Sequence, residues 1–180
     1  TLTITVKYNG SENLNNTAKD ISIMLHKKDT TVSFKDTAFN LNKVYNGKSV
    51  TVDVDNDIHK TENAPEVTLN WNKKDGTKAG KYQLNISIPE DAYYNGSSVK
   101  HDFEISKAKL SVEVKVKDKQ YDGLNTAEIE TVTLVGVAEG DQITLINGTP
   151  TFASVDAGEN IAIHFTEFTL DAEKDVLNNY

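Results

Sequence analysis

The chain of 180 residues is 37% hydrophobic and 26% charged, has a formal net charge of −8 and contains no Cys. This composition supports a packed core, and the lack of Cys excludes disulfide bonds, Cys-based zinc sites and a Cys nucleophile. All 19 basic residues are Lys, so the chain lacks the bidentate guanidinium clamp of most phosphate and guanine recognition, and we expect no nucleic-acid binding.

The negative charge is concentrated in the C-terminal part of the chain. Residues 1–107 contain 14 Lys and 14 acidic residues, whereas residues 108–180 contain 5 Lys and 13 acidic residues. Such a surface repels nucleic acid and anionic lipid. No apolar run approaches the ~18 residues of a membrane span, and the first residues do not resemble a signal peptide. We therefore expect no membrane insertion, and we expect the signal and the anchor to lie outside these residues.

Hydrophobic residues alternate with a period of two along most of the chain, which is typical of half-buried strands. Helical periodicity with capping residues is missing, and Val, Ile and Thr recur where strands are expected. The sequence therefore predicts an all-β fold, with strands in chain order within residues 49–55, 81–88, 109–117, 142–148 and 160–170.

One tripeptide pattern, Tyr followed by Asn or Asp and then Gly, occurs at four points. Asn-Gly and Asp-Gly favour tight hairpin turns because both residues take positive φ at little cost. Each preceding Tyr is expected to end a strand, with its ring on the core and its hydroxyl at the water. The four copies are Tyr8-Asn9-Gly10, Tyr45-Asn46-Gly47, Tyr94-Asn95-Gly96 and Tyr121-Asp122-Gly123.

The tripeptides also indicate an internal repeat of roughly 75 residues. Tyr121 follows Tyr45 by 76 positions, and the segments around Tyr8 and Tyr94 align with each other when a short insertion is allowed. We expect residues 32–107 to be one complete repeat and residues 108–180 to be a second that lacks its last strand. Residues 1–31 are then the closing strands of a preceding repeat, or strands packed on the next module. This phase predicts that the sequence is part of a longer protein.

Residues 108–180 contain Tyr121-Asp122-Gly123, "GVAEGD" at 136–141, "FASVDAG" at 152–158 and the closing Asn179-Tyr180. Through these motifs this segment resembles the YDG-type repeat of large bacterial surface proteins. The segment "DAEKDVLNN" is longer than is usual before the final Tyr. Residues 37–106 resemble the related MBG-type repeats more loosely, through "KVYNGKSVTV", "AGKYQLNISI" and "FEISKA".

The resemblance implies tandem immunoglobulin-like β-sandwich modules in an adhesin-like protein that is secreted or attached to the cell wall. Such modules serve as a stalk or spacer, or as weak adhesion modules, and their partners are neighbouring repeats and host or cell-wall glycans or matrix proteins. The resemblance supplies no catalytic residues and no cofactor, so we expect a chain that is not an enzyme. The Lys- and Asn-rich, Arg-free composition points to an AT-rich Gram-positive bacterium.

An alternative function is a carbohydrate-binding accessory module of a surface polysaccharide-utilisation protein. Trp71, Tyr93 and Tyr94 are the aromatic residues that could contact a sugar, provided that all three are exposed on one face. A single Trp in an alternating strand more often belongs to the core.

Metal-binding and cross-linking patterns are weak. The four His residues lie far apart in the sequence and do not form a zinc or general-base pattern. Residues 53–57 imitate the start of a calcium loop, but Ile58 and Ala64 occupy the positions of the required Gly and Glu. We expect these acids to alternate on an exposed strand. A weaker calcium site at Asp171, Glu173 and Asp175 and a Lys–Asn isopeptide bond are left as hypotheses.

Overall fold

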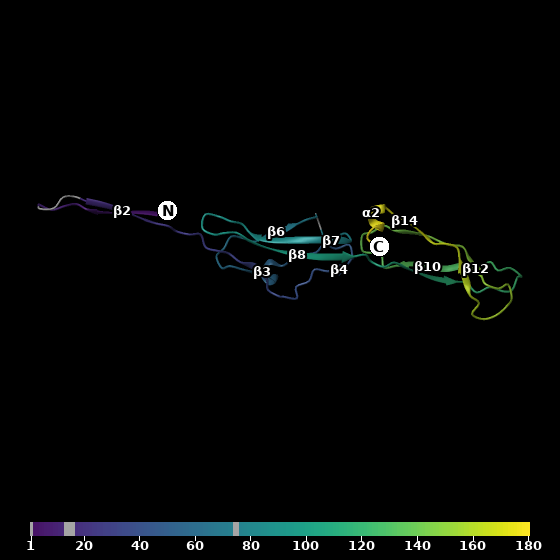
Figure 1. Cartoon of the computed structure of the whole chain (residues 1–180). Coiled ribbons are helices and arrows are strands. Elements are labelled where there is room, and N and C mark those ends of the chain that lie inside the picture. The colour runs from purple at the N-terminus through teal and green to yellow at the C-terminus, as the bar shows by residue number, and fades with distance from the viewer. Residues whose placement is uncertain (1, 13–16, 74–75) are drawn as a thin grey trace. The chain divides into compact units, whose positions relative to one another are not determined.

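The computed structural model describes residues 2–12, 17–73 and 76–180 of the chain (Figure 1). Most of the regular structure in these residues is β-strand, arranged in sheets of two or four strands. Each of the two helices is only four residues long. The prediction of an all-β fold is therefore confirmed.

Two compact units can be distinguished, and each combines three stretches of the chain. The first contains Thr1–Phe39, Asp53–Asn70 and Asn85–Lys100, and the second contains Asn40–Val52, Trp71–Leu84 and His101–Tyr180. The repeat boundaries after residues 31 and 107 stay a prediction.

The first unit contains two antiparallel strand pairs. β1 (Leu2–Tyr8) pairs with β2 (Thr17–Ile23) in a hairpin whose described hydrophobic side chains are exposed. β3 (Val32–Phe34) pairs with β5 (Ile58–Lys60). Val32 and Ile58 are buried, so this second pair contributes to a core.

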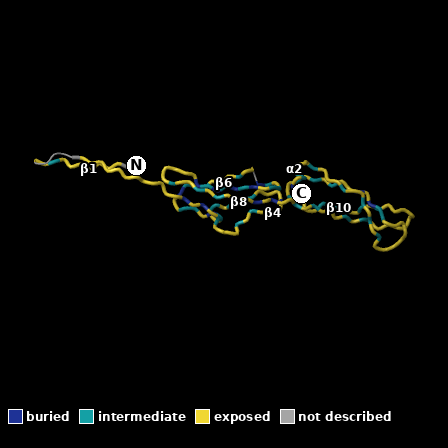
Figure 2. Tube along the Cα trace, in the orientation of Figure 1, coloured by how far each residue is buried: buried dark blue, intermediate teal, exposed yellow. Residues whose placement is uncertain are grey.

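A four-stranded sheet provides most of the buried surface. Its strands have the order β4-β8-β7-β6, and β4 runs parallel to β8 with Lys43 opposite Ile105. β7 alternates between buried and less buried side chains, as the sequence predicts, and Figure 2 shows the buried segments along this sheet. The strands are β4 (Lys43–Val44), β6 (Thr68–Trp71), β7 (Gly80–Ile88) and β8 (Ser97–Ser106).

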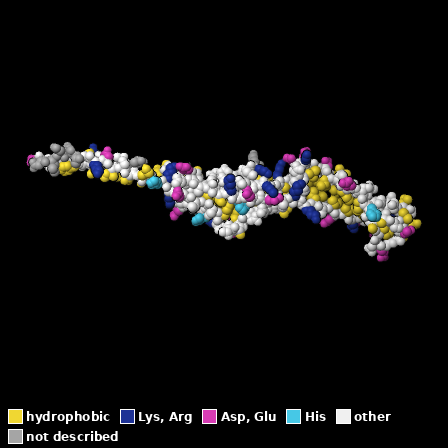
Figure 3. All heavy atoms as spheres, in the orientation of Figure 1, with side chains coloured by type: hydrophobic (Ala, Val, Ile, Leu, Met, Phe, Trp, Pro, Cys, Tyr) yellow, Lys and Arg dark blue, Asp and Glu magenta, His cyan; other side chains and the backbone are white. Residues whose placement is uncertain are grey.

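The C-terminal part of the second unit consists of three antiparallel pairs, β9-β10, β11-β14 and β12-β13. Val112 on β9 and Val135 on β10 are 37% and 38% exposed, and Figure 3 shows hydrophobic side chains gathered at the surface in this part of the molecule. The elements are β9 (Ser111–Val116), β10 (Ile129–Val135), β11 (Thr144–Ile146), β12 (Pro150–Phe152), β13 (Ile163–Phe165), β14 (Thr169–Asp171) and α2 (Lys174–Leu177).

The prediction of a strand within residues 49–55 is wrong. A short helix, α1 (Val54–Asp57), lies at its end, and Asp53 caps it by accepting hydrogen bonds from the N–H groups of Asp55 and Asn56, both at 3.1 Å. A carboxylate that can satisfy the free N–H groups of a first turn favours a helix start over a strand. The acids at 53–57 therefore do not alternate on a strand.

The prediction of tight hairpin turns at the four tripeptides is also wrong. Two of them lie in longer loops, at 89–96 and 117–128. Tyr8 is the last residue of β1, whose partner β2 begins only at Thr17, and Tyr45 follows β4, whose partner β8 is parallel. Gly10, Gly47 and Gly123 have positive φ, but in the described chain the Asn and Asp of the tripeptides do not. A two-residue hairpin turn of this type needs positive φ at both positions.

No helix in the described ranges has the length and apolar character that a membrane span requires.

Shortening Leu84 tests the assignment of the core to the four-stranded sheet. Leu84 is fully buried, so we expect Leu84→Ala to lower the free energy of unfolding by about 2–5 kcal/mol, because it removes packed methyl groups and leaves a cavity. Lys81→Ala, at an exposed position of the same strand, is the matched control and should change it by less than about 0.5 kcal/mol. Equal losses in urea unfolding would contradict the assignment.

Candidate functional site

Two loops of the second unit share one pattern of hydrogen bonds, and we call residues 43–48 and 119–124 the Lys–Asx loops. In the first, Asn46 Oδ1 accepts from the N–H of Lys48 at 3.1 Å and from Lys43 Nζ at 3.2 Å. Lys43 Nζ also donates to the carbonyl oxygen of Lys48. The side chains thus close the loop from within.

The second Lys–Asx loop repeats these bonds. Asp122 Oδ1 accepts from the N–H of Leu124 at 2.9 Å and from Lys119 Nζ at 2.8 Å, and Lys119 Nζ donates to the carbonyl oxygen of Leu124 at 2.8 Å. Gly47 and Gly123 have nearly equal φ angles, +74° and +75°. The same local sequence therefore gives the same local structure at both places.

The charges of the two loops differ. The hydrogen bond from Lys119 is the main cause that holds the pKa of Asp122 below its usual range, and the N–H of Leu124 adds to it. Asn46 is neutral, and burial lowers the pKa of Lys43. The second loop thus contains an internally compensated ion pair, whereas the first loop has two positive charges, those of Lys43 and Lys48, and no acidic residue.

Tyr45 and Tyr121, which precede the two Gly residues, have opposite environments. Tyr45 is 7% exposed and Tyr121 is 69% exposed. The N–H of Tyr45 donates to the carbonyl oxygen of Ser106 at 2.8 Å, which continues the pairing of β4 with β8. The expectation that a Tyr ring lies on the core while its hydroxyl meets water fits neither residue. The Tyr45 hydroxyl has a protein partner, and Tyr121 as a whole is exposed.

That partner is Asp141, whose carboxylate accepts two phenol hydroxyls. Tyr45 donates to Asp141 Oδ2 at 2.8 Å and Tyr180 donates to the same oxygen at 2.6 Å. The Tyr180 hydroxyl in turn accepts from the N–H of Ala138 at 2.8 Å. The two rings meet edge to face with their centroids 5.5 Å apart. We call these residues the tyrosine–aspartate cluster.

Backbone geometry positions Asp141 within this cluster. Its N–H donates to the carbonyl oxygen of Ala138 at 3.1 Å, which closes a turn at 138–141 that contains Gly140 with φ of +92°, and Gly136 with φ of +96° lies just before this turn. A Cβ added to Gly136 would lie 2.3 Å from the carbonyl oxygen of Lys109. Only Gly allows this approach.

The cluster changes the acidity of both phenols. Burial is the largest cause that raises the pKa of Tyr45 to about 12, and the hydrogen bond and negative charge of Asp141 add to it. Burial, and then the bond to Asp141, also raises the pKa of Tyr180. Both hydroxyls thus stay protonated at neutral pH and donate to Asp141.

Asn179, next to Tyr180, is one of two buried polar residues among those that the structure describes; the other is Thr30. Asn179 Oδ1 accepts from the N–H of Ala79 at 3.0 Å, and its carbonyl oxygen accepts from the N–H of Ala108 at 2.9 Å. Lys107 Nζ donates to the carbonyl oxygen of Tyr180 at 2.9 Å. The last two residues are therefore bonded to the segment at 107–108 and to the loop before β7.

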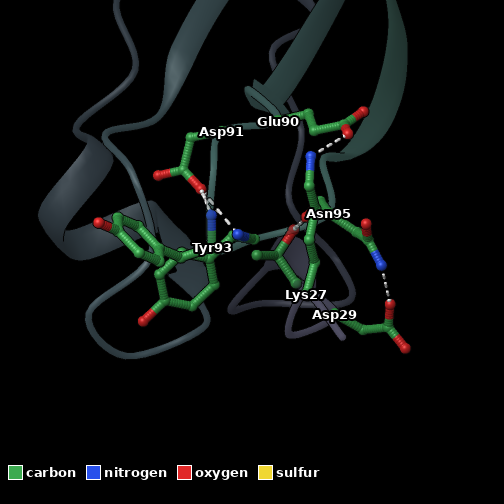
Figure 4. Close-up of polar contacts among 8 residues, drawn as sticks. Lys27, Asp29, Glu90, Asp91, Tyr93 and Asn95 are labelled. Atoms are coloured by element: carbon green, nitrogen blue, oxygen red, sulfur yellow. Dashed lines mark hydrogen bonds and ion pairs between the residues drawn. The ribbon is translucent and has the colours of Figure 1, made fainter. Parts of the chain in front are cut away.

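The first unit contains a comparable arrangement around the Tyr94-Asn95-Gly96 tripeptide (Figure 4). The N–H of Lys28 donates to the carbonyl oxygen of Tyr93 at 2.8 Å, as the N–H of Ala108 does to Asn179. Asn95 Nδ2 donates to Asp29 Oδ1 at 2.7 Å. Lys28 and Ala108 occupy matching places when "KKDTTV" at 27–32 is aligned with "KAKLSV" at 107–112. One backbone bond thus recurs in both units.

The family comparison covers the part of the chain that holds Asp141, Asn179 and Tyr180. Residues 106–180 match the family model described as the YDG domain. This part of the chain is a YDG-type domain. Neither the curated proteins nor the solved structures gave a match. The YDG domain begins at Ser106, the residue whose carbonyl oxygen binds the N–H of Tyr45.

The aromatic candidates for sugar binding fall in different units. Trp71, in the second unit, is half-buried and meets Phe103 edge to face at 5.8 Å. Tyr93 and Tyr94 belong to the first unit, where Tyr93 is 76% exposed and Tyr94 is half-buried. In Figure 4 the ring of Tyr93 points away from the ion pair of Lys27 with Glu90. Sugar binding by these residues stays a prediction.

Within the described ranges, no group of three or more His, Asp or Glu residues is placed to hold a metal ion. Asp175, one of the acids considered for calcium, forms an ion pair with Lys78 at 2.9 Å. Both side chains of that pair are largely exposed, so it contributes little to stability.

The motifs of the YDG domain are visible in the sequence, but the roles of Asp141, Asn179 and Tyr180 are not. All three lie in motifs that the sequence displays, "GVAEGD" and the closing Asn-Tyr. One signal could have indicated these roles. The motifs combine glycines, which a turn needs, with polar residues, which a turn does not need.

Matched substitutions of Gly47 and Gly123 test the contact of the first Lys–Asx loop. Both have positive φ, so Ala at either position should cost about 1–2 kcal/mol. A Cβ on Gly47 would also lie 2.9 Å from the carbonyl oxygen of Glu139, whereas one on Gly123 would meet nothing within 4 Å. In urea unfolding, Gly47→Ala should therefore destabilise the protein more than Gly123→Ala does. Equal losses would show that the contact is absent.

The acidity of Tyr45 predicts how stability falls in alkaline solution. Because its pKa is about 12 in the folded chain and 10.0 in the unfolded one, its contribution is complete below pH 10 and is lost as the pH rises to about 12. Titration of the phenolate absorbance should show a step near pH 12 for Tyr45 beside a raised step for Tyr180, and Tyr45→Phe should reduce the late absorbance change by one phenol. If the late absorbance change is the same in this variant, the assignment to Tyr45 is wrong.

Proposed function

We propose that the chain is a non-catalytic structural module of a secreted or cell-wall-attached bacterial surface protein. In this proposal, residues 32–107 and 108–180 are tandem immunoglobulin-like β-sandwich repeats, the first of MBG type. They act as a stalk or spacer, or as a weak adhesion module. The YDG domain and the all-β fold support this proposal, because both belong to the repeat class that the sequence resembles.

The observation that carries the proposal is the tyrosine–aspartate cluster. Tyr45 comes from the first proposed repeat, and Asp141 and Tyr180 come from the second. A spacer must hold successive modules in a fixed relation, and a shared carboxylate with well-packed rings does this better than a flexible linker. Asn179 adds two further bonds, to Ala79 and Ala108.

The polar groups of the cluster also fit a structural role better than a catalytic one. Each hydroxyl of Tyr45 and Tyr180 is bonded to Asp141, and Tyr180 also accepts from Ala138. A catalytic acid or base must instead reach a substrate. We therefore propose no enzyme activity for these residues.

A second function, carbohydrate binding, is favoured by one specific observation. Tyr93 is 76% exposed on a loop whose backbone is fixed, because Asp91 Oδ1 accepts from the N–H groups of Tyr93 and Tyr94, both at 2.7 Å. A fixed, exposed ring can stack on the apolar face of a sugar. Under this alternative the chain is an accessory module of a surface polysaccharide-utilisation protein.

Loss of the cluster should separate the motions of the two proposed repeats. We expect backbone amides of residues 32–107 and of residues 108–180 to tumble with one correlation time in ¹⁵N relaxation. Asp141→Ala leaves two phenol hydroxyls without their charged acceptor, which should cost about 2–5 kcal/mol and give the two repeats separate correlation times. Asp156→Ala, in an exposed loop, is the matched control. Independent tumbling of the unchanged protein would refute the spacer role.

A glycan and matrix-protein array distinguishes the two functions. A pure spacer should bind no component of the array. If binding is found and Tyr93→Ala removes it while the melting temperature is unchanged, the carbohydrate-binding function replaces the spacer. Trp71→Ala is less informative, because its loss also removes the contact with Phe103.

A further inference from the structure

Tyr121 differs from Tyr45 in what surrounds it and not in its own loop. The two Lys–Asx loops make the same internal bonds, and their Gly φ angles differ by only one degree, +74° against +75°. Tyr45 is nevertheless 7% exposed, whereas Tyr121 is 69% exposed. The second loop thus presents the same surface that the first loop uses to bind Asp141. Among the described hydrogen bonds, however, the Tyr121 hydroxyl has no partner.

The strand beside the first loop shows what accompanies docking. β4 pairs in parallel with β8, and the carbonyl oxygen of Ser106 at the end of β8 accepts from the N–H of Tyr45 at 2.8 Å. The chain then continues into the YDG domain, which contains Asp141. In the described part of the chain, Lys119 and Gln120, which occupy the places of Lys43 and Val44, belong to no strand.

An open groove lies beside the second loop. Its volume is about 800 Å³, and Tyr121 and Leu124 line it together with Phe152 and Val155. Tyr121, Leu124 and Val155 are exposed, the last two by 57% and 47%. The apolar side chains of this groove offer a packing surface for a strand like β8, whose buried face carries Phe103 and Ile105.

The charge of the second loop is also compatible with binding a turn that carries an aspartate, as the turn of Asp141 does. The carboxylate of Asp122 is paired with Lys119 at 2.8 Å, so an approaching aspartate does not meet an uncompensated negative charge. Where the first loop has Lys48, which lies 3.6 Å from Glu139, the second loop has Leu124. Because that ion pair is exposed and contributes little, its replacement by an apolar side chain still permits docking.

We propose that the loop at 119–124 is a docking site for a further YDG-type module, in which an aspartate at the place of Asp141 accepts the Tyr121 hydroxyl. The interface continues the one that Tyr45 forms with Asp141, so each module presents its Lys–Asx loop to the next YDG-type turn. The proposal rests on the function proposed above and adds the partner and the residue that recognises it.

The test extends the full chain by a second copy of residues 95–180, joined directly after Tyr180. This junction places the copied β8 and YDG domain after Tyr180 as they follow Tyr94 in the natural sequence. Nitration of Tyr121 by tetranitromethane is followed by peptide mass spectrometry. In the extended chain the rate should fall about tenfold, the ratio of 69% to 7% exposure. Asp→Asn at the copied position 141 should restore the original rate.

Tyr45 provides the internal control, because it should stay protected in both chains. If Tyr121 reacts equally fast in both chains while Tyr45 and the copied Tyr180 stay protected, the docking proposal is wrong and the spacer function still stands. A further sample, in which the unextended chain is present in excess as a separate molecule, distinguishes whether the docking YDG-type module belongs to a second chain or to the same chain. Protection in this arm assigns docking to a second chain, and protection only in the extended chain assigns it to a module that follows covalently.

Discussion

One carboxylate oxygen, Asp141 Oδ2, organises the second unit because it satisfies two phenols at once. Tyr45 lies 96 positions before Asp141 and Tyr180 lies 39 positions after it. A phenol hydroxyl taken from water needs an acceptor, and a charged acceptor gives the stronger bond. The aspartate ends a turn that contains Gly140, which has positive φ, and Gly136 before this turn permits the close approach of Lys109. The packing of the two rings therefore depends on backbone geometry that glycine alone allows.

The Lys–Asx loops show the opposite kind of constraint, since they close through bonds within six residues. The Lys ammonium bridges the Asx side chain and a carbonyl oxygen, so the loop needs no distant partner to hold its shape. For this reason one motif can recur at two places in the second unit whose surroundings differ. The motif sets the local backbone around the Tyr, and distant parts of the chain decide whether its ring is buried.

Much of the fold was predictable from the sequence, and the predictions that failed have a common physical cause. The strands at 81–88 and 109–117 follow from alternation, because burial on one face of a sheet has a period of two. The segment at 49–55 also alternates, but Asp53 satisfies the first N–H groups of α1 and stops the strand. Asn-Gly and Asp-Gly favour hairpin turns, whereas the side chains of Asn46 and Asp122 bind groups of their own loops instead. At Asp53, Asn46 and Asp122 a short polar side chain thus competes with the β-ladder.

The all-β class and the YDG domain follow from the amino-acid order alone, because strand alternation and motif spacing are local properties. The sequence also contains Asp141, Asn179 and Tyr180 in visible motifs, but without their roles. The bonds within the Lys–Asx loops, the burial of Tyr45 and the exposure of Tyr121 are known from the folded structure, although both Tyr residues stand in the same motif. Burial depends on which distant part of the chain lies opposite a side chain, and no local pattern contains that information.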